Sequence, residues 1–106
     1  MSDHYTYRIS WSAAEQEYVA TVAEFPSLSW LDEDRGRALK GLETAVADIL
    51  TDMRATGEAP PTPLAERSYS GTFQIRTTPE RHRELALAAA EQRVSMNKLV
   101  NDRLAM

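Results

Sequence analysis

The segment over residues 71–79 constrains the fold of this chain more than any other part of the sequence. It reads GTFQIRTTP, so polar side chains alternate with the apolar Phe73 and Ile75. Strict alternation predicts a β-strand with one solvated face and one apolar face. Two helical segments follow, and a strand with two helices cannot bury its own apolar face. We therefore expect two copies to pair these strands antiparallel, which gives a two-stranded ribbon and at least a homodimer.

The solvated face of this strand carries Thr72, Gln74 and Arg76. Gln and Arg form bidentate hydrogen bonds with the edges of adenine and guanine, and a two-stranded ribbon fits the major groove of double-stranded DNA. The sequence therefore predicts that Gln74 and Arg76 on this face contact the bases of double-stranded DNA. The alternative is a helical hairpin used only for dimerisation, in which the same residues are a solvated strand face.

Capping residues predict where two helices follow the strand. Thr77 or Thr78 can cap the first helix, with Pro79 in its first turn. That helix is expected to break near residues 92–94, and Ser95 is expected to cap a final helix. The strand, the threonine cap and the two helices at this spacing form a pattern that is much more specific than the strand alone.

The start of the final helix is a candidate phosphate site. A helix N-terminus presents free backbone N–H groups and the positive end of the helix dipole. We therefore expect DNA phosphates to bind at Ser95, Met96, Asn97 and Lys98. Other basic side chains would add attraction that weakens as salt rises. These are Arg81, Arg83 and Arg93.

The front of the chain predicts a small antiparallel sheet with one covering helix. Strands are expected over residues 5–11, 17–23 and 28–30, and the helix between Asp32 as N-cap and Gly57 as C-cap. Its apolar stripe recurs at three- and four-residue steps and would pack on the sheet. The stripe consists of Leu39, Leu42, Val46, Ile49, Leu50 and Met53.

Two features of this helix need separate comment. Gly41 costs about 1 kcal/mol relative to Ala inside a helix, and nothing in the sequence explains it. The acidic run Asp32, Glu33 and Asp34 invites a metal interpretation. Consecutive carboxylates at a helix start point in different directions, so capping and the helix dipole explain them better. We expect no metal, no cofactor and no catalytic residue.

The proline-rich segment over residues 59–70 divides the chain into two modules. Proline fixes its own backbone and biases the residue before it, so this segment is expected to be a stiff, extended linker. The predicted domains are residues 1–58 and residues 71–106. The fold class is α+β.

Charge also divides the chain. Residues 1–66 carry 12 acidic and 5 basic side chains and residues 67–106 carry 4 and 7, so balances of −7 and +3 make up the net charge of −4. The basic rear suits a polyanion, and the acidic front suits a basic protein.

The remaining composition limits where such a chain acts. The 106 residues contain no cysteine, which excludes disulfides and thiolate metal sites. No apolar run approaches the roughly 18 residues that span a bilayer, and the polar N-terminus does not resemble a secretory signal. We expect a cytoplasmic protein without a membrane partner.

The chain resembles the HicB family of antitoxins over nearly its full length, and residues 71–105 look like a ribbon-helix-helix domain. The motifs that carry the resemblance lie over residues 5–8, 17–21, 24–30, 57–61, 85–92 and 94–100.

The resemblance implies a partly RNase H-like front domain that neutralises a HicA-like toxin, a small basic ribonuclease that cleaves mRNA. It also implies a dimeric tail that represses its own operon through operator DNA. By match to the ribbon-helix-helix pattern, Thr72, Gln74 and Arg76 are base-reading positions. Ser95 and Asn97 fall on the phosphate-contacting helix start.

One position departs from the family. Arg93 stands where members often have glycine between the two helices, and a positive φ there is costly for a residue with a side chain.

Three hypotheses follow. The first is a type II antitoxin that binds both toxin and DNA. The second is a stand-alone ribbon-helix-helix regulator without a toxin. The third is a degenerate nuclease that would use Asp32, Glu33 or Asp34, which we expect least because metal catalysis needs oriented ligands. Two dimers joined through their front modules would make a tetramer.

Overall fold

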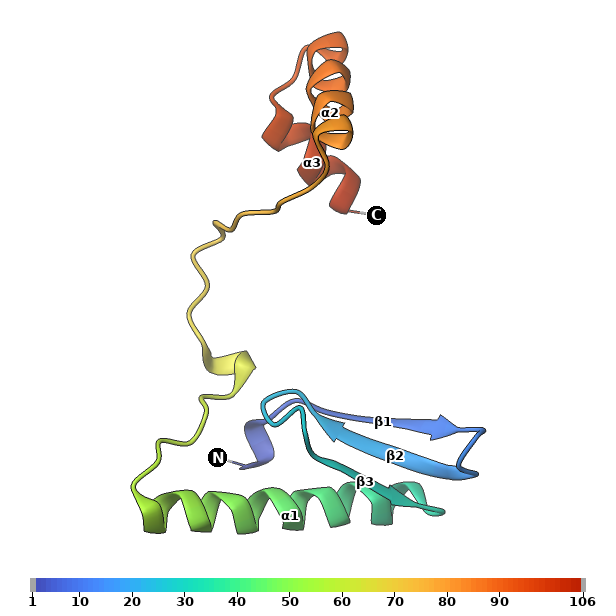
Figure 1. The fold of residues 1–106 in the computed structure, drawn as a ribbon, viewed down its shortest axis with the longest axis vertical. Coiled ribbons are helices and arrows are strands. Elements are labelled where there is room, and N and C mark those ends of the chain that lie inside the picture. The colour runs from blue at the N-terminus through green and yellow to red at the C-terminus, as the bar shows by residue number, and fades with distance from the viewer. Residues whose placement is uncertain (1, 106) are drawn as a thin grey trace. The chain divides into compact units, whose positions relative to one another are not determined.

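A computed structural model describes residues 2–105, and these contain three β-strands and three α-helices (Figure 1). They divide into a first unit that ends at Tyr69 and a second unit that begins at Ser70. The predicted α+β class is confirmed. The elements are β1 (Tyr7–Ser12), β2 (Glu17–Val22), β3 (Ser29–Asp32), α1 (Arg35–Thr56), α2 (Pro79–Gln92) and α3 (Met96–Leu104).

The three strands form the predicted antiparallel meander in the order β1-β2-β3. Ile9 lies opposite Ala20, and Ala20 lies opposite Trp30, so these three side chains share one face of the sheet. The three predicted strands are thus present, and their antiparallel order is the expected one. Figure 1 shows α1 lying along this small sheet.

The core of the first unit lies between α1 and the sheet. Leu42 and Val46 of α1 are fully buried, as is Ala20 of β2. Each buried aliphatic side chain of this size contributes roughly 1.5–3 kcal/mol to folding. The predicted stripe is thus the packed face of the helix. The buried cluster consists of Tyr5, Ala20, Val22, Ala38, Leu42, Val46 and Leu50.

The N-cap of α1 is Asp34, and the prediction of Asp32 was wrong by two residues. Asp34 Oδ2 accepts a hydrogen bond from the backbone N–H of Arg37 at 2.9 Å. Asp32 is still part of β3, opposite Tyr18, so its backbone is extended and the helix cannot begin there. Its Oδ1 instead accepts from Asp34 N at 2.8 Å and from Arg37 Nε at 3.0 Å.

The C-cap of α1 is Gly57, as predicted. It has φ 79°, in the left-handed region that glycine adopts without strain. The following N–H of Glu58 donates to Met53 O at 2.9 Å, which ends the helix in the usual way.

Gly41, unexplained by the sequence, lies under an indole ring. A Cβ at this position would stand 2.1 Å from Nε1 of Trp30. The ring of Trp30 therefore occupies the space that any side chain at residue 41 would need, and glycine is required for close contact between β3 and α1.

Residues 59–69, which we call the strap, belong to the first unit instead of forming a free linker. Pro63 is fully buried, and a 3-10 turn follows it at Leu64–Glu66. Of the segment expected to be a linker, residue 70 alone lies in the second unit.

No helix among residues 2–105 combines the length and the apolar character that crossing a membrane requires.

Candidate nucleic-acid interface

The second unit opens with an irregular segment, residues 70–78, where the sequence predicts a strand. Gly71 has φ 85°, and the N–H of Thr72 donates to Ser70 Oγ at 3.1 Å. Residues 70–78 form no strand in the single chain. The physical reason is that a strand needs a ladder with a neighbouring strand, and the described part of this chain supplies none here.

Both alternating sets of side chains in this segment are exposed to solvent. Phe73 and Ile75, the predicted apolar set, are 73% and 65% exposed. Thr72, Gln74 and Arg76, the predicted base-reading set, are also exposed. Solvent exposure suits the polar set. Two large apolar side chains with this exposure form an apolar patch, whose contact with water is unfavourable.

Thr78 caps α2, which settles the choice between the two threonines. Its backbone is extended at φ −75° and ψ 152°, and its Oγ1 accepts from the N–H of Arg81 at 3.2 Å. Pro79 occupies the first helical position, where a missing N–H costs nothing.

The start of α3 has the geometry of an anion site. Ser95 is the N-cap, as predicted, and its Oγ accepts from the N–H of Lys98 at 3.0 Å. The N–H groups of Met96 and Asn97, at the first two helical positions, have no acceptor within the helix. These two backbone donors are what this helix end can offer to a phosphate.

The side chains at this helix start divide in their roles. Met96 is half-buried and faces a groove beside Ile75 and Val100, so its contribution to a phosphate site is its N–H. Lys98 Nζ lies 3.0 Å from Asp102 Oδ2, and both side chains are more than half exposed. An exposed pair of this spacing contributes only about 0.3–0.5 kcal/mol, so Lys98 can exchange Asp102 for a phosphate at little cost.

Arg93 ends α2 in the left-handed conformation, with φ 58° and ψ 41°. The positive φ expected from its position between the helices is confirmed. Its N–H donates to Ala90 O at 3.2 Å, and the next N–H, of Val94, donates to Ala89 O at 3.0 Å. This closure fixes the turn that brings α3 back against α2.

Two grooves open on the second unit, with volumes of about 760 Å³ and about 470 Å³. Ile75, Met96 and Val100 line both of them. Leu85 adds apolar surface to the larger groove, and Phe73 and Leu104 add it to the smaller.

The second unit buries very little of its own. Its buried hydrophobic residues within the described chain are Ala89 and Leu99. A module of this size rarely folds alone on such a core. In α3, Leu99 is buried, whereas Val100 is half-buried and Leu104 is largely exposed.

The acidic run at the start of α1 has structural roles. Asp34 caps the helix and Asp32 binds the backbone at residue 34, a hydrogen bond that lowers the pKa of the Asp32 carboxyl. Among residues 2–105 no group of three His, Asp or Glu side chains is arranged to hold a metal ion.

The two units together define an α+β chain in which an acidic sheet-and-helix unit precedes a helix pair with an open apolar surface. Residues 56–104 match the protein-family model described as HicB family. This match covers the strap and most of the second unit, and over these residues the chain is similar to that family. Comparisons with curated proteins and with solved structures gave no significant match.

Proposed function

We propose that this protein is the antitoxin of a type II toxin–antitoxin system, with DNA binding in its second unit and toxin binding in its first. The match to the HicB family suggests a protein associated with such a system. The observation that carries the DNA-binding half is the open apolar surface beside the exposed polar set of residues 70–78. The proposed site of action is the cytoplasm.

A second copy of the chain is the proposed cover for Phe73 and Ile75. Antiparallel pairing of two segments would satisfy their backbone groups and turn both apolar sets toward the grooves of the two helix pairs. The polar sets would then share the opposite face of a two-stranded ribbon. This arrangement is a ribbon-helix-helix dimer.

In the proposal, the polar face of the ribbon carries Thr72, Gln74 and Arg76, and this face enters the major groove of operator DNA. Gln74 and Arg76 have the side chains for bidentate reading of adenine and guanine. Thr72 is short and would contact a thymine methyl group or support the ribbon. The N–H groups at the start of α3 would bind the flanking phosphates and fix the register.

The first unit is the proposed toxin-binding part. Residues 1–69 carry 12 acidic and 6 basic side chains, whereas residues 70–106 carry 4 and 6. The acidic unit would repel DNA and attract a small basic protein, which is the character of a HicA-like ribonuclease. In this proposal the chain is a binding protein and not an enzyme, and the first unit has a partly RNase H-like fold that serves binding alone.

The test of base reading is Arg76→Ala against Arg8→Ala, which removes the same charge from β1. A duplex that covers the promoter of the chain's own gene is the probe, with a shuffled duplex beside it. Arg76→Ala should lose about 1–3 kcal/mol of promoter affinity and less on the shuffled duplex. Equal affinity of Arg76→Ala and the parent for the promoter would remove the base-reading proposal.

A stand-alone regulator is the second candidate, and one observation favours it. The family match begins at residue 56, so it leaves out the sheet and nearly all of α1. Co-expression decides between the two. If a small basic protein encoded beside this gene arrests growth and the chain relieves the arrest, the antitoxin proposal stands. If no neighbouring gene product is toxic, the regulator is the better description.

A further inference from the structure

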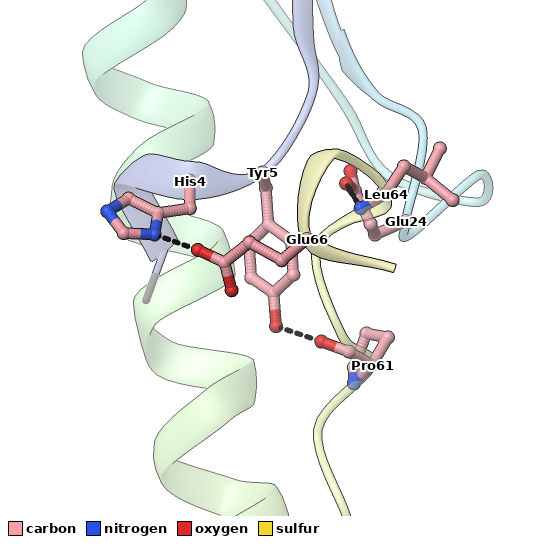
Figure 2. Close-up of polar contacts among 6 residues, drawn as sticks. All are labelled: His4, Tyr5, Glu24, Pro61, Leu64 and Glu66. Atoms are coloured by element: carbon pink, nitrogen blue, oxygen red, sulfur yellow. Dashed lines mark hydrogen bonds and ion pairs between the residues drawn. The ribbon is translucent and has the colours of Figure 1, made fainter. Parts of the chain in front are cut away.

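The strap is attached to the first unit by burial and by a set of long-range hydrogen bonds (Figure 2). Pro63 is among the largest fully buried side chains in the described chain, and Pro60, Pro61 and Leu64 are half-buried. Proline-rich segments without contacts are solvated spacers. This one is packed against the unit that precedes it.

Glu24 is the centre of the attachment. Its Oε2 accepts from the backbone N–H of Leu64 at 2.9 Å and from the hydroxyl of Thr6 at 3.0 Å. Its Oε1 accepts from the N–H of Thr6 at 2.8 Å. One carboxylate thus joins the residue before β1, the corner after β2 and the strap, which lies 40 residues further along the chain.

The electrostatics favour a charged carboxylate at this point. Partial burial by itself raises the pKa of the Glu24 carboxyl, but the N–H groups of Leu64 and Thr6 outweigh it, and the pKa is lowered overall. Charge-assisted hydrogen bonds of this kind are about twice as strong as neutral ones.

Two further contacts, at Pro61 and Glu66, hold the strap on either side of Leu64, and a third hydrogen bond, from Tyr69 to Leu64, lies within the strap itself. The hydroxyl of Tyr5 donates to Pro61 O at 2.8 Å, and burial raises the pKa of this hydroxyl, so it remains a donor. His4 Nδ1 contacts Glu66 Oε1, and Figure 2 shows both contacts beside Glu24. The hydroxyl of Tyr69 donates to Leu64 O at 2.9 Å.

We propose that Glu24 clasps the strap to the first unit and thereby sets the length of the tether between the two units. The proposal rests on the proposed function in one respect, because the far end of the tether is taken as the ribbon that begins at Thr72. With the clasp closed, the tether beyond the last contact of the strap with the rest of the unit, at Glu66, is residues 67–71, and with the whole strap detached it is residues 58–71.

The difference in reach is large. An extended chain spans at most about 3.3–3.6 Å per residue, so the closed tether reaches about 17 Å and the open tether about 48 Å. Effective concentration falls roughly as the −3/2 power of tether length, so closing the clasp raises the local concentration of the first unit near the ribbon by about five-fold. A partner bound to the first unit is then held beside the DNA.

The experiment measures the distance between the units in the full chain. The protein has no cysteine, so Ser10→Cys on β1 and Glu91→Cys on α2 give two unique spin-label positions, both exposed. Labelled chains are diluted with unlabelled ones so that distances within one chain dominate. Glu24→Ala is compared with Glu58→Ala, which removes the same charge just before the strap without touching the clasp.

The parent and Glu58→Ala should give the same distance distribution, and Glu24→Ala should give a distribution up to roughly two-fold wider and shifted to longer distances. Tyr5→Phe removes one strap hydrogen bond but leaves Glu24 and Thr6 joined, and it should broaden the distribution part of the way. It supplies the test if Glu24→Ala does not fold.

Amide hydrogen exchange at Leu64 reads the clasp directly. The amide should be protected in the parent and exchange about ten-fold faster in Glu24→Ala. Equal distance distributions in the parent, Glu24→Ala and Tyr5→Phe, or an unprotected Leu64 amide in the parent, would overturn the proposal. Neither measurement uses DNA, so the failure of DNA binding and the failure of the clasp remain distinguishable.

Discussion

At the scale of single residues, Gly41 shows how one missing side chain places an element. The position that a Cβ would take is 2.1 Å from Trp30 Nε1, so the indole of β3 rests directly on the backbone of α1. A residue that weakens the helix by about 1 kcal/mol is therefore retained for contact between sheet and helix.

Gly41→Ala should destabilise the first unit although alanine favours helices. The gain of about 1 kcal/mol in propensity is outweighed by displacement of Trp30, because overpacking costs about 1–3 kcal/mol. Urea unfolding measures the net loss, and tryptophan emission should shift to the red as the ring moves into water. Ala47→Gly, on the exposed side of α1, reports propensity alone. Unchanged or increased stability of Gly41→Ala would show that the position of the Trp30 ring does not depend on glycine at residue 41.

At Arg93 the backbone conformation determines how a substitution changes stability. A left-handed residue with a side chain costs roughly 1–2 kcal/mol, and Arg93 has φ 58°. Arg93→Gly should therefore raise the free energy of unfolding of the second unit by about 1 kcal/mol, measured by thermal unfolding. Gly57→Ala, at φ 79° after α1, should change stability in the opposite direction. A destabilised Arg93→Gly would mean that the arginine side chain holds the turn.

Glu24 gives a prediction in pH. Its folded-state pKa lies below its ordinary value of 4.5, so its contribution to stability is complete above that value and is lost as pH falls through the folded pKa. Glu24→Gln removes the titration. The difference in unfolding free energy between the parent and Glu24→Gln should be largest near neutral pH and shrink as pH falls below 4.5 and through the lowered folded-state pKa. A difference that does not change with pH would exclude the carboxylate as the charged partner.

At the scale of elements, much of the fold could be predicted because its signals are local. Alternation located β1, short strand-like segments located β2 and β3, and the apolar stripe located α1. Short-range capping located Ser95 and Gly57 and narrowed the N-cap of α2 to Thr77 or Thr78. The N-cap of α1 was misplaced because pairing with β2 extends β3 through Asp32, and pairing is not a local property.

The contacts missed by the sequence are those between distant residues. Glu24 and Leu64 are separated by 40 positions, and nothing near either residue indicates the other. The prolines over residues 59–70 predicted a stiff, extended linker, because the same residues suit both a solvated spacer and a segment packed on its own unit. The predicted strand over residues 71–79 is absent for a different reason, since its pairing partner would come from another chain.

The apolar set of residues 70–78 yields a prediction about assembly. Ile75→Asp places a charge in both grooves of the second unit and should weaken self-association at least about ten-fold, because burying an unpaired charge is costly. Leu87→Asp is the matched control, since Leu87 is 51% exposed on α2 and lines neither groove. Sedimentation over a concentration series measures both. Equal weakening by the two variants would mean that these grooves are not the interface.

At the scale of the whole molecule, the chain is two units with different means of stability. The first has a closed core between α1 and the sheet, whereas the second buries Ala89 and Leu99 and leaves its larger apolar side chains open. In the proposed assembly, a second copy covers that surface and the covered form binds DNA.

The most direct measurement is the mass of the full-length protein in solution at micromolar concentration, by sedimentation equilibrium, alone and with a duplex of its own promoter. The account predicts a particle of at least two 11.9 kDa chains, and a further increase in mass when the promoter is added. A particle with the mass of one chain, unchanged by the duplex, would contradict it.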